Sequence, residues 1–214
     1  MQTDALIAGL ADDLSPIPAG AVARRLIIGL GLGALGSVAV MLAWLGLRPD
    51  LAAAVMTVMF WMKLAYALAT GLVLAAALGR LARPAAKLGG LATLVVAPFA
   101  VMVALAVTRL MQAEPAAWSS LVLGASYNLC PVRIMAIGAP VLAGAVWALR
   151  GLAPTRLTLA GLAAGGCAGG LGAAVYAFAC DETAAPFVAI WYTLGMGLVA
   201  AMGGLAGSRW LRWR

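Results

Sequence analysis

Six long apolar runs constrain this chain more than any other feature of its sequence. A helix needs about 20 mostly apolar residues to cross the hydrocarbon layer of a membrane, and each run is close to that length. Because the runs are apolar on every face, the alternating pattern of a transmembrane barrel is excluded. The sequence therefore predicts an all-α membrane protein, a bundle of six transmembrane helices. The runs are Leu26–Leu47, Met59–Gly79, Leu88–Thr108, Val132–Leu149, Leu157–Ala179 and Phe187–Gly207.

The composition of the whole chain agrees with this class. Of its 214 residues, 65% are hydrophobic and 10% are charged, whereas a soluble domain has roughly 45–50% apolar and about 25% charged residues. A large water-soluble domain is therefore excluded. The chain contains no histidine, which excludes imidazole-based hydrolysis and histidine-ligated metal centres.

The basic residues predict that both termini are cytoplasmic. Lys and Arg concentrate in cytoplasmic loops, and six spans with the N-terminus inside place ten of the 14 basic residues on the inner side. The net charge of +7 is then explained by topology, without any nucleic-acid partner. The four outer basic residues are Arg48, Lys63, Arg109 and Arg133. Lys63 and Arg109 come nearest to mid-span, and we expect both side chains to extend outward to the interface.

The segment before the first span is predicted to bind a protein partner. Residues 1–23 form the cytoplasmic N-terminal segment, and residues 24–214 form the transmembrane domain. A short amphipathic helix lying on the membrane surface is the alternative, but such helices are usually basic. An acidic amphipathic helix instead favours docking in a groove of a protein partner. The apolar stripe consists of Leu6, Ile7, Leu10 and Leu14, and its acidic companions are Asp4, Asp12 and Asp13.

Glycines in the fifth span predict close helix packing. Gly161, Gly165 and Gly169 recur every four residues, and such a face of small residues lets helix backbones approach closely in a membrane. We expect this helix to lie at the centre of the bundle. Glycines in residues 31–36 match a dinucleotide-binding string, but they lie inside a span with no preceding strand, so we interpret them as packing residues too.

Two cysteines fall on the outer side in this topology. Cys130 precedes the fourth span, and Cys180 follows the fifth span and is followed in turn by Asp181 and Glu182. Two thiols at one surface can bind a soft metal ion or react with oxidants, with the carboxylates as accessory oxygen ligands. A structural disulfide is the alternative, because the outer compartment is oxidising. Cys167 lies in mid-span and is expected to be inert.

Aromatic residues lie at both ends of the sixth span. Trp191 and Tyr192 are near its outer end, while Trp210 and Trp213 stand beside arginines at its inner end. Tryptophan and tyrosine are enriched at membrane interfaces. We therefore interpret all four residues as interfacial anchors.

Several short stretches, in order along the whole chain, resemble the six-span anti-sigma factors of the NrsF type. They are residues 3–7 (TDALI), residues 47–51 (LRPDL), Cys130, Tyr176 with residues 180–182 (CDE), Trp191-Tyr192 and residues 209–213 (RWLRW). The resemblance implies a protein of the bacterial cytoplasmic membrane that holds an extracytoplasmic-function (ECF) sigma factor inactive and does not contact nucleic acid directly. It also implies that Cys130 and Cys180 take part in the response to heavy-metal or oxidative stress.

Two other functions agree less well with the sequence than this regulator does. A membrane thiol oxidoreductase that passes electrons to quinone is disfavoured, because the sequence has no adjacent pair of redox cysteines. A small-solute transporter is expected to carry ionisable residues in mid-span, where only Lys63 and Arg109 come close. We therefore expect a regulator rather than an enzyme, with no cofactor beyond transient soft-metal binding at the two thiols.

Overall fold

A computed structural model of the chain describes residues 20–84 and 87–211, together with residues 3, 7, 9 and 18. Most of the predicted N-terminal helix, including Asp4, Leu6, Leu10, Asp12, Asp13 and Leu14, therefore lies outside the described residues. Ile7 is described, and its side chain is 59% exposed. The account of the fold below concerns the membrane domain.

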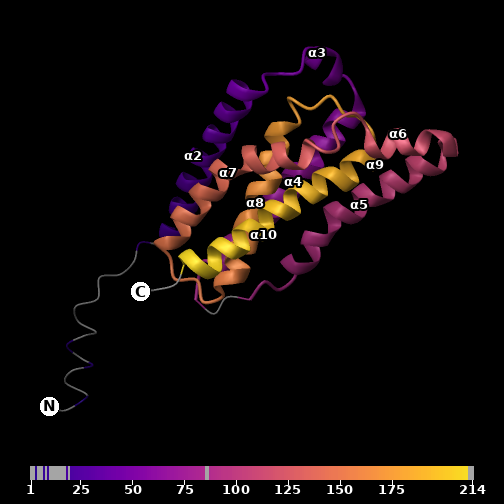
Figure 1. Ribbon diagram of the computed structural model, residues 1–214. Helices are drawn as coiled ribbons and strands as arrows, with labels where there is room; N and C mark the ends of the chain where they lie inside the picture. The colour runs from indigo at the N-terminus through magenta and orange to yellow at the C-terminus, as the bar shows by residue number, and fades with distance from the viewer. Residues whose placement is uncertain are drawn as a thin grey trace.

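The described residues form six helices that are long and apolar enough to cross a membrane, as predicted (Figure 1). The first five are α2 (Ala21–Trp44), α4 (Val58–Leu81), α5 (Leu91–Met111), α7 (Cys130–Arg150) and α8 (Leu157–Tyr176). The sixth combines α9 (Ala185–Phe187), a π-helical turn η2 (Val188–Tyr192) and α10 (Thr193–Trp210). The loops contain the short helices α3 (Leu51–Ala54), η1 (Pro115–Ala117) and α6 (Trp118–Leu123).

Local sequence signals explain where several helices begin. The Thr57 hydroxyl accepts a hydrogen bond of 3.3 Å from the backbone N–H of Phe60 and so caps α4. Pro131 occupies the first turn of α7, where its missing N–H costs no helical hydrogen bond. Gly20 precedes α2 with a φ of 90°, a left-handed conformation that favours glycine.

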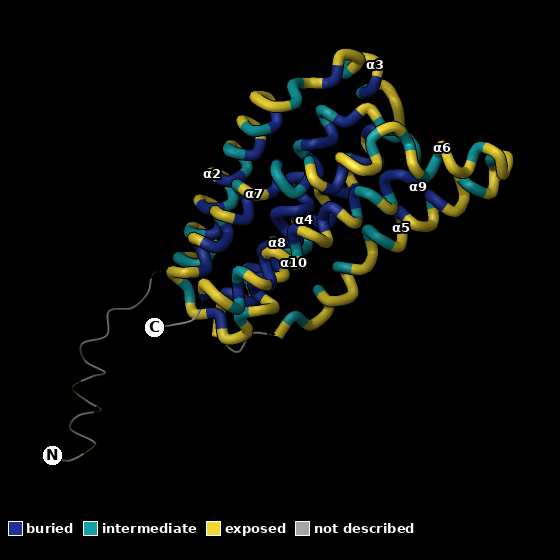
Figure 2. The backbone as a smooth tube through the Cα atoms, viewed as in Figure 1, coloured by how far each residue is buried: buried dark blue, intermediate teal, exposed yellow. Residues whose placement is uncertain are grey.

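Helix α8 lies at the centre of the bundle and α5 lies at its edge (Figure 2). α8 packs against α4, α7 and α10. In the apolar window of α8, 72% of the residues are buried, against 11% in α5. The α5 helix therefore presents most of its surface to lipid.

The central position of α8 depends on its glycines. An added Cβ at Gly169 would lie 2.8 Å from the Cα of Met196, and one at Gly165 would lie 2.8 Å from the Cα of Ala200. An added Cβ at Gly161 would overlap the backbone carbonyl of Gly203. The backbones of α8 and α10 therefore touch along a seam that only glycine permits.

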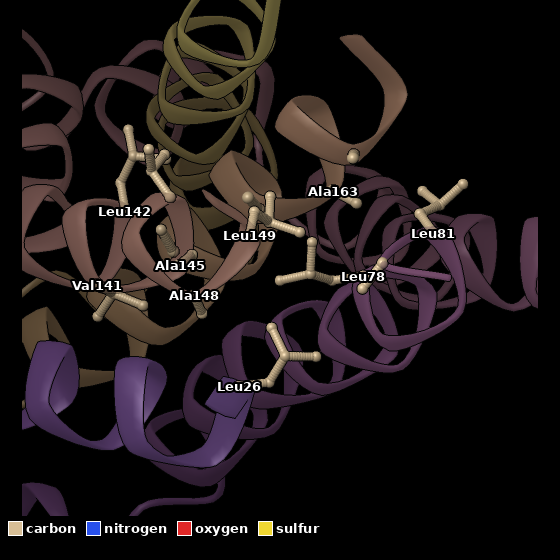
Figure 3. Close-up of a cluster of buried hydrophobic side chains, with 14 of the residues drawn as sticks. Leu26, Leu78, Leu81, Val141, Leu142, Ala145, Ala148, Leu149 and Ala163 are labelled. Atoms are coloured by element: carbon tan, nitrogen blue, oxygen red, sulfur yellow. The ribbon is translucent and has the colours of Figure 1, made fainter. Parts of the chain in front are cut away.

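The bundle has two ends with different chemistry. One end, here called the basic end, carries the start of α2, the ends of α4 and α7, and the end of α10. Its core joins side chains from α2, α4, α7 and α8, and Leu26, Leu78 and Leu149 converge there (Figure 3). The other end, here called the thiol end, contains a second buried cluster that includes Cys130 and Cys180.

Candidate functional site

The two predicted outer cysteines lie in the same buried cluster at the thiol end. Cys130 is the first residue of α7, and Cys180 lies in the loop that follows α8. Their exposed fractions are 0% and 1%, and both thiols are free. Cys167 is also free and buried, but it lies within α8.

Lys63 lies at the thiol end, although the sequence analysis did not assign it to the candidate site. Its side chain is 1% exposed, so it does not extend outward to the interface as we expected. Instead, the Lys63 ammonium donates hydrogen bonds of 2.9 Å to the backbone carbonyls of Cys180 and Glu182. The 180–182 loop folds over the start of α4, and its carbonyls replace the water that the ammonium would otherwise bind.

A second cationic side chain, that of Arg48, contacts the same loop. The residue follows α2, and its Nη1 donates a hydrogen bond of 2.9 Å to the Cys180 carbonyl. Its Nε and Nη2 each donate a 2.7 Å hydrogen bond to the Asp50 carboxylate, forming a bidentate ion pair. Hydrogen bonding to Asp50 raises the pKa of Arg48, although burial opposes the shift, and the same bonds lower the pKa of Asp50.

The Cys180 carbonyl therefore accepts hydrogen bonds from two cationic side chains. We call this arrangement, formed by Lys63, Arg48 and the Cys180 carbonyl oxygen, the carbonyl clamp. Hydrogen bonds from charged donors are about twice as strong as neutral ones. The clamp fixes the backbone of Cys180 relative to α2 and α4.

Glu182 ties the loop of Cys180 to the turn that precedes Cys130. Its Oε1 accepts hydrogen bonds from the backbone N–H groups of Ala125 (2.7 Å) and Ser126 (3.0 Å), and from the Ser126 hydroxyl (3.1 Å). Gly124 permits this contact, because it has a φ of 54° and an added Cβ would lie 2.7 Å from the carboxylate carbon. The Glu182 carboxylate is thus engaged in fixing the loop.

The acidic side chains near the two thiols do not form a ready-made metal site with them in the described part of the chain. Among the described residues, no group of three or more Cys, Asp or Glu side chains is placed to hold a metal ion. A soft cation at this end would therefore rely on Cys130 and Cys180 themselves, with further ligands from solvent or backbone carbonyls.

The interpretation of Tyr192 as an interfacial anchor was wrong. Its side chain is 0% exposed, and its ring lies 5.8 Å from the ring of Tyr176 in the thiol-end cluster. The π-helical turn η2 includes this residue. Trp191 is partly buried, and its indole N–H donates a 2.8 Å hydrogen bond to the Val122 carbonyl. The pair therefore packs the thiol end from inside.

Helices α2, α4 and α7 are among those that run between the thiol end and the basic end. α2 runs from the basic end to the loop of Arg48, α4 carries Lys63 near its start, and α7 begins at Cys130. The carbonyl clamp and Cys130 therefore contact the thiol-end parts of helices whose opposite ends lie at the basic end. This geometry defines a multi-pass membrane protein with two buried cysteines in a cluster at one end and a basic surface at the other.

Comparison with known proteins places this architecture in a family. The family model NrsF, described as negative regulator of sigma F, matches residues 10–213. The chain is 41% identical over 217 residues to the anti-sigma-F factor NrsF of Caulobacter vibrioides, and 40% identical over 215 residues to the probable anti-sigma-F factor NrsF of Azospira oryzae. Both alignments cover 100% of each chain. No solved structure matches the chain.

The chain therefore belongs to the NrsF family, as the sequence stretches had indicated. Its relatives carry the names of regulators rather than of enzymes.

Proposed function

We propose that this protein is an anti-sigma factor of the bacterial cytoplasmic membrane that holds an ECF-type sigma factor inactive at its cytoplasmic face. Full-length identity of about 40% to two anti-sigma-F factors is the observation that carries the proposal. In this proposal the basic end is cytoplasmic and the thiol end is extracytoplasmic, which agrees with the distribution of lysine and arginine. Both termini are then inside.

The N-terminal segment is the proposed main contact with the sigma factor. Leu6, Ile7, Leu10 and Leu14 form the apolar stripe, and Asp4, Asp12 and Asp13 supply charge that suits a basic partner surface. The 59% exposure of Ile7 supports this role, because its apolar surface is free to bind a partner. Residues 1–23 thus act as the binding segment and residues 24–214 as the membrane-embedded sensor.

The thiol end is the proposed input. Cys130 and Cys180 bind a soft metal ion, or an oxidant such as a peroxide takes electrons from their thiols and is itself reduced. Either event changes the backbone around Cys180. The carbonyl clamp then transfers that change to α2 and α4, while Cys130 transfers it to α7. Asp181 and Glu182 are accessory residues, of which Glu182 holds the loop in register through its contacts with residues 125–126.

Release of the sigma factor requires a minimum free energy from the event at the thiol end. Moving a two-state equilibrium from 1:99 to 99:1 requires about 5.5 kcal/mol of differential binding between the two states. Metal–thiolate bonds or a newly formed disulfide are of sufficient strength to supply it. If the Cys180 loop moves, the hydrogen bonds of the carbonyl clamp break. Their loss then contributes to the free-energy difference between the two states.

Co-purification tests the proposed partner directly. The tagged chain is extracted in detergent from its native host, and mass spectrometry identifies the bound proteins. We expect a sigma factor to co-purify with the wild type and to be lost from Leu6→Asp and Leu10→Asp, because a carboxylate cannot enter an apolar partner groove. Matched substitutions in the exposed outer loop, such as Ala116→Asp, keep the sigma factor. If no sigma factor is captured, the proposal fails.

A further inference from the structure

A groove of about 640 Å³ opens at the basic end of the bundle. The start of α2, the residues that follow α4 and the end of α7 enclose it, so the same three helices that lead from the thiol end form its walls. Its apolar lining includes Ile28, Trp147 and Leu152, and its charged lining includes Arg24 and Arg83. Ile28 and Trp147 are 44% and 49% exposed, which leaves apolar surface uncovered.

The charges at the groove lack acidic neighbours in the described part of the chain. The described carboxylates are Asp50, Glu114, Asp181 and Glu182, and the order of the spans places all four at the thiol end. Arg25 lies over the Trp147 ring at 4.8 Å, and its Nε donates a 3.0 Å hydrogen bond to the Ala148 carbonyl. The rim of the groove is therefore a cationic surface built around an apolar floor.

The complementary chemistry occurs in the N-terminal segment of the same chain. The three carboxylates that remain, Asp4, Asp12 and Asp13, all precede residue 20, next to the apolar stripe of Leu6, Ile7, Leu10 and Leu14. A segment with acidic residues and a narrow apolar stripe matches both the cationic rim and the apolar floor. Ile7, the described member of the stripe, has most of its side chain exposed.

The tether between segment and groove is short enough to favour their contact. Residues 15–19 span at most roughly 17 Å when extended, and Ala21, which follows Gly20, itself lines the groove. A short linker of this kind gives an effective concentration in the millimolar range, so weak contacts suffice for docking. The left-handed φ of Gly20 lets the chain change direction at the groove.

We propose that the groove at the basic end is a docking site for the chain's own residues 1–14, with Arg24 and Arg83 contacting the aspartates and Ile28, Trp147 and Leu152 contacting the apolar stripe. Docking in the groove and binding to a sigma factor then use the same side chains and exclude each other. This competition, though not the docking itself, rests on the function proposed above. The groove is formed by α2, α4 and α7, which also reach the thiol end. Its affinity for residues 1–14 therefore changes when the thiol end changes conformation.

Cysteine cross-linking of the full chain in neutral-lipid nanodiscs, with no sigma factor present, tests the docking. A short bismaleimide is applied to the Ile7→Cys, Ala153→Cys variant, since Ala153 is exposed and lines the groove. The matched control is Ile7→Cys, Thr93→Cys, because Thr93 is exposed near the start of α5 and does not line the groove. We expect at least about fivefold faster cross-linking at Ala153. The chain with only its three native buried thiols supplies the background. Equal rates at the two positions overturn the proposal.

Charge reversal separates self-docking from other occupants of the groove. Arg24→Glu with Arg83→Glu is expected to slow the Ile7–Ala153 cross-link by about fivefold or more, and adding Asp12→Lys with Asp13→Lys is expected to restore it. A cross-linking rate that is the same in all of these charge variants overturns the proposal. So does its disappearance when phosphatidylglycerol is included in the nanodiscs, because the groove then belongs to anionic lipid headgroups.

A last arm distinguishes failure of the docking from failure of the proposed function. Purified sigma factor is added to the cross-linking reaction. Suppression of the Ile7–Ala153 cross-link supports competition for one segment. If the cross-link forms without sigma factor and is unchanged by it, docking stands and the role of residues 1–14 in sigma binding fails. If the cross-link never forms while sigma factor still binds, the docking proposal fails alone.

Discussion

At the residue scale, two cations converge on one carbonyl oxygen beside a thiol. Lys63 and Arg48 both donate to the Cys180 carbonyl, and Lys63 also donates to the Glu182 carbonyl. A buried ammonium is costly unless its protons are accepted by good partners, so the loop and the lysine depend on each other. The conformation of the Cys180 loop is therefore set by side chains from α4 and from the loop that follows α2.

Removing the lysine is expected to free the loop. Lys63→Met keeps most of the side-chain length but removes the charged donor of the Glu182 carbonyl and one of the two charged donors of the Cys180 carbonyl. Each such bond contributes about 1.5–3 kcal/mol. We expect alkylation of Cys180 by a membrane-impermeant maleimide to become about tenfold faster, as measured by peptide mass spectrometry. Lys87→Met, at an exposed position of the basic end, serves as the control. Unchanged protection of Cys180 in Lys63→Met argues against the clamp.

The Arg48–Asp50 pair gives the thiol end a defined pH dependence. The pKa of Asp50 is lowered in the folded protein by its bonds to Arg48, so the pair stabilises the fold above the unfolded pKa of about 3.9. That contribution is lost as the pH falls through the lowered folded pKa. We expect Asp50→Asn to have a lower Tm than wild type at pH 7, and the two Tm values to converge in strong acid. A difference that persists or grows in acid contradicts this role.

At the element scale, the sequence predicted the six spans and the glycine face of α8. It did not predict which helices pack against that face. The four-residue repeat of Gly161, Gly165 and Gly169 indicated a close approach, because glycine spacing on one helix face is visible in the sequence. Their partners on α10, and the contact of Gly170 with Gly71, depend on how distant spans align, which no local pattern specifies. An added Cβ at Gly170 would lie 2.6 Å from the Gly71 Cα, so that position requires glycine, whereas an added Cβ at Gly71 would lie 3.1 Å from the Leu171 nitrogen.

The placement of Lys63 shows a second limit of sequence reasoning. A lysine near a span end ordinarily extends to the interface, and only the folded 180–182 loop supplies carbonyls that make burial favourable. Tyr192 was misread for a similar reason, since its burial depends on the π-helical turn and on Tyr176. By contrast, the two cysteines were assigned to one end correctly by counting spans.

Paired glycine substitutions test the α8–α10 seam. At Gly165 an added Cβ meets backbone atoms of Val199 and Ala200, whereas at Gly197 nothing lies within 4 Å. Gly165→Ala is therefore expected to lower the stability in detergent by about 1–3 kcal/mol, the usual range for overpacking. Gly197→Ala is expected to be neutral or slightly stabilising, because alanine favours a helix. Equal Tm values for the two variants contradict a glycine-dependent seam, as does normal stability of Gly165→Leu.

At the scale of the whole molecule, α2, α4 and α7 each run from the thiol end to the groove at the basic end. Each of these helices has one end at the buried thiols or the clamp and the other at the basic groove. The core of Leu26, Leu78 and Leu149 holds the three helices together beside the groove (Figure 3). A two-state shift of this unit would connect an outer event to an inner contact without any further domain.

If the thiols act as one sensor, their single substitutions should be equivalent. Cys130→Ser and Cys180→Ser are expected to give the same altered response to a soft metal ion in a sigma-dependent reporter strain, and the double variant no more than either. Cys167→Ser should respond as wild type, because its thiol lies apart within α8. Additive and unequal effects of the two outer substitutions would exclude a shared site.

The link between thiols and sigma binding can be measured on the purified complex. The chain with its bound sigma factor is reconstituted in nanodiscs, Cd²⁺ is added, and the released sigma factor is quantified for the wild type and for Cys130→Ser with Cys180→Ser. We expect Cd²⁺ to release most of the sigma factor from the wild type and to leave it bound to the double variant. Release from both proteins to the same extent, or retention by both, would contradict control of the sigma factor through the thiol end.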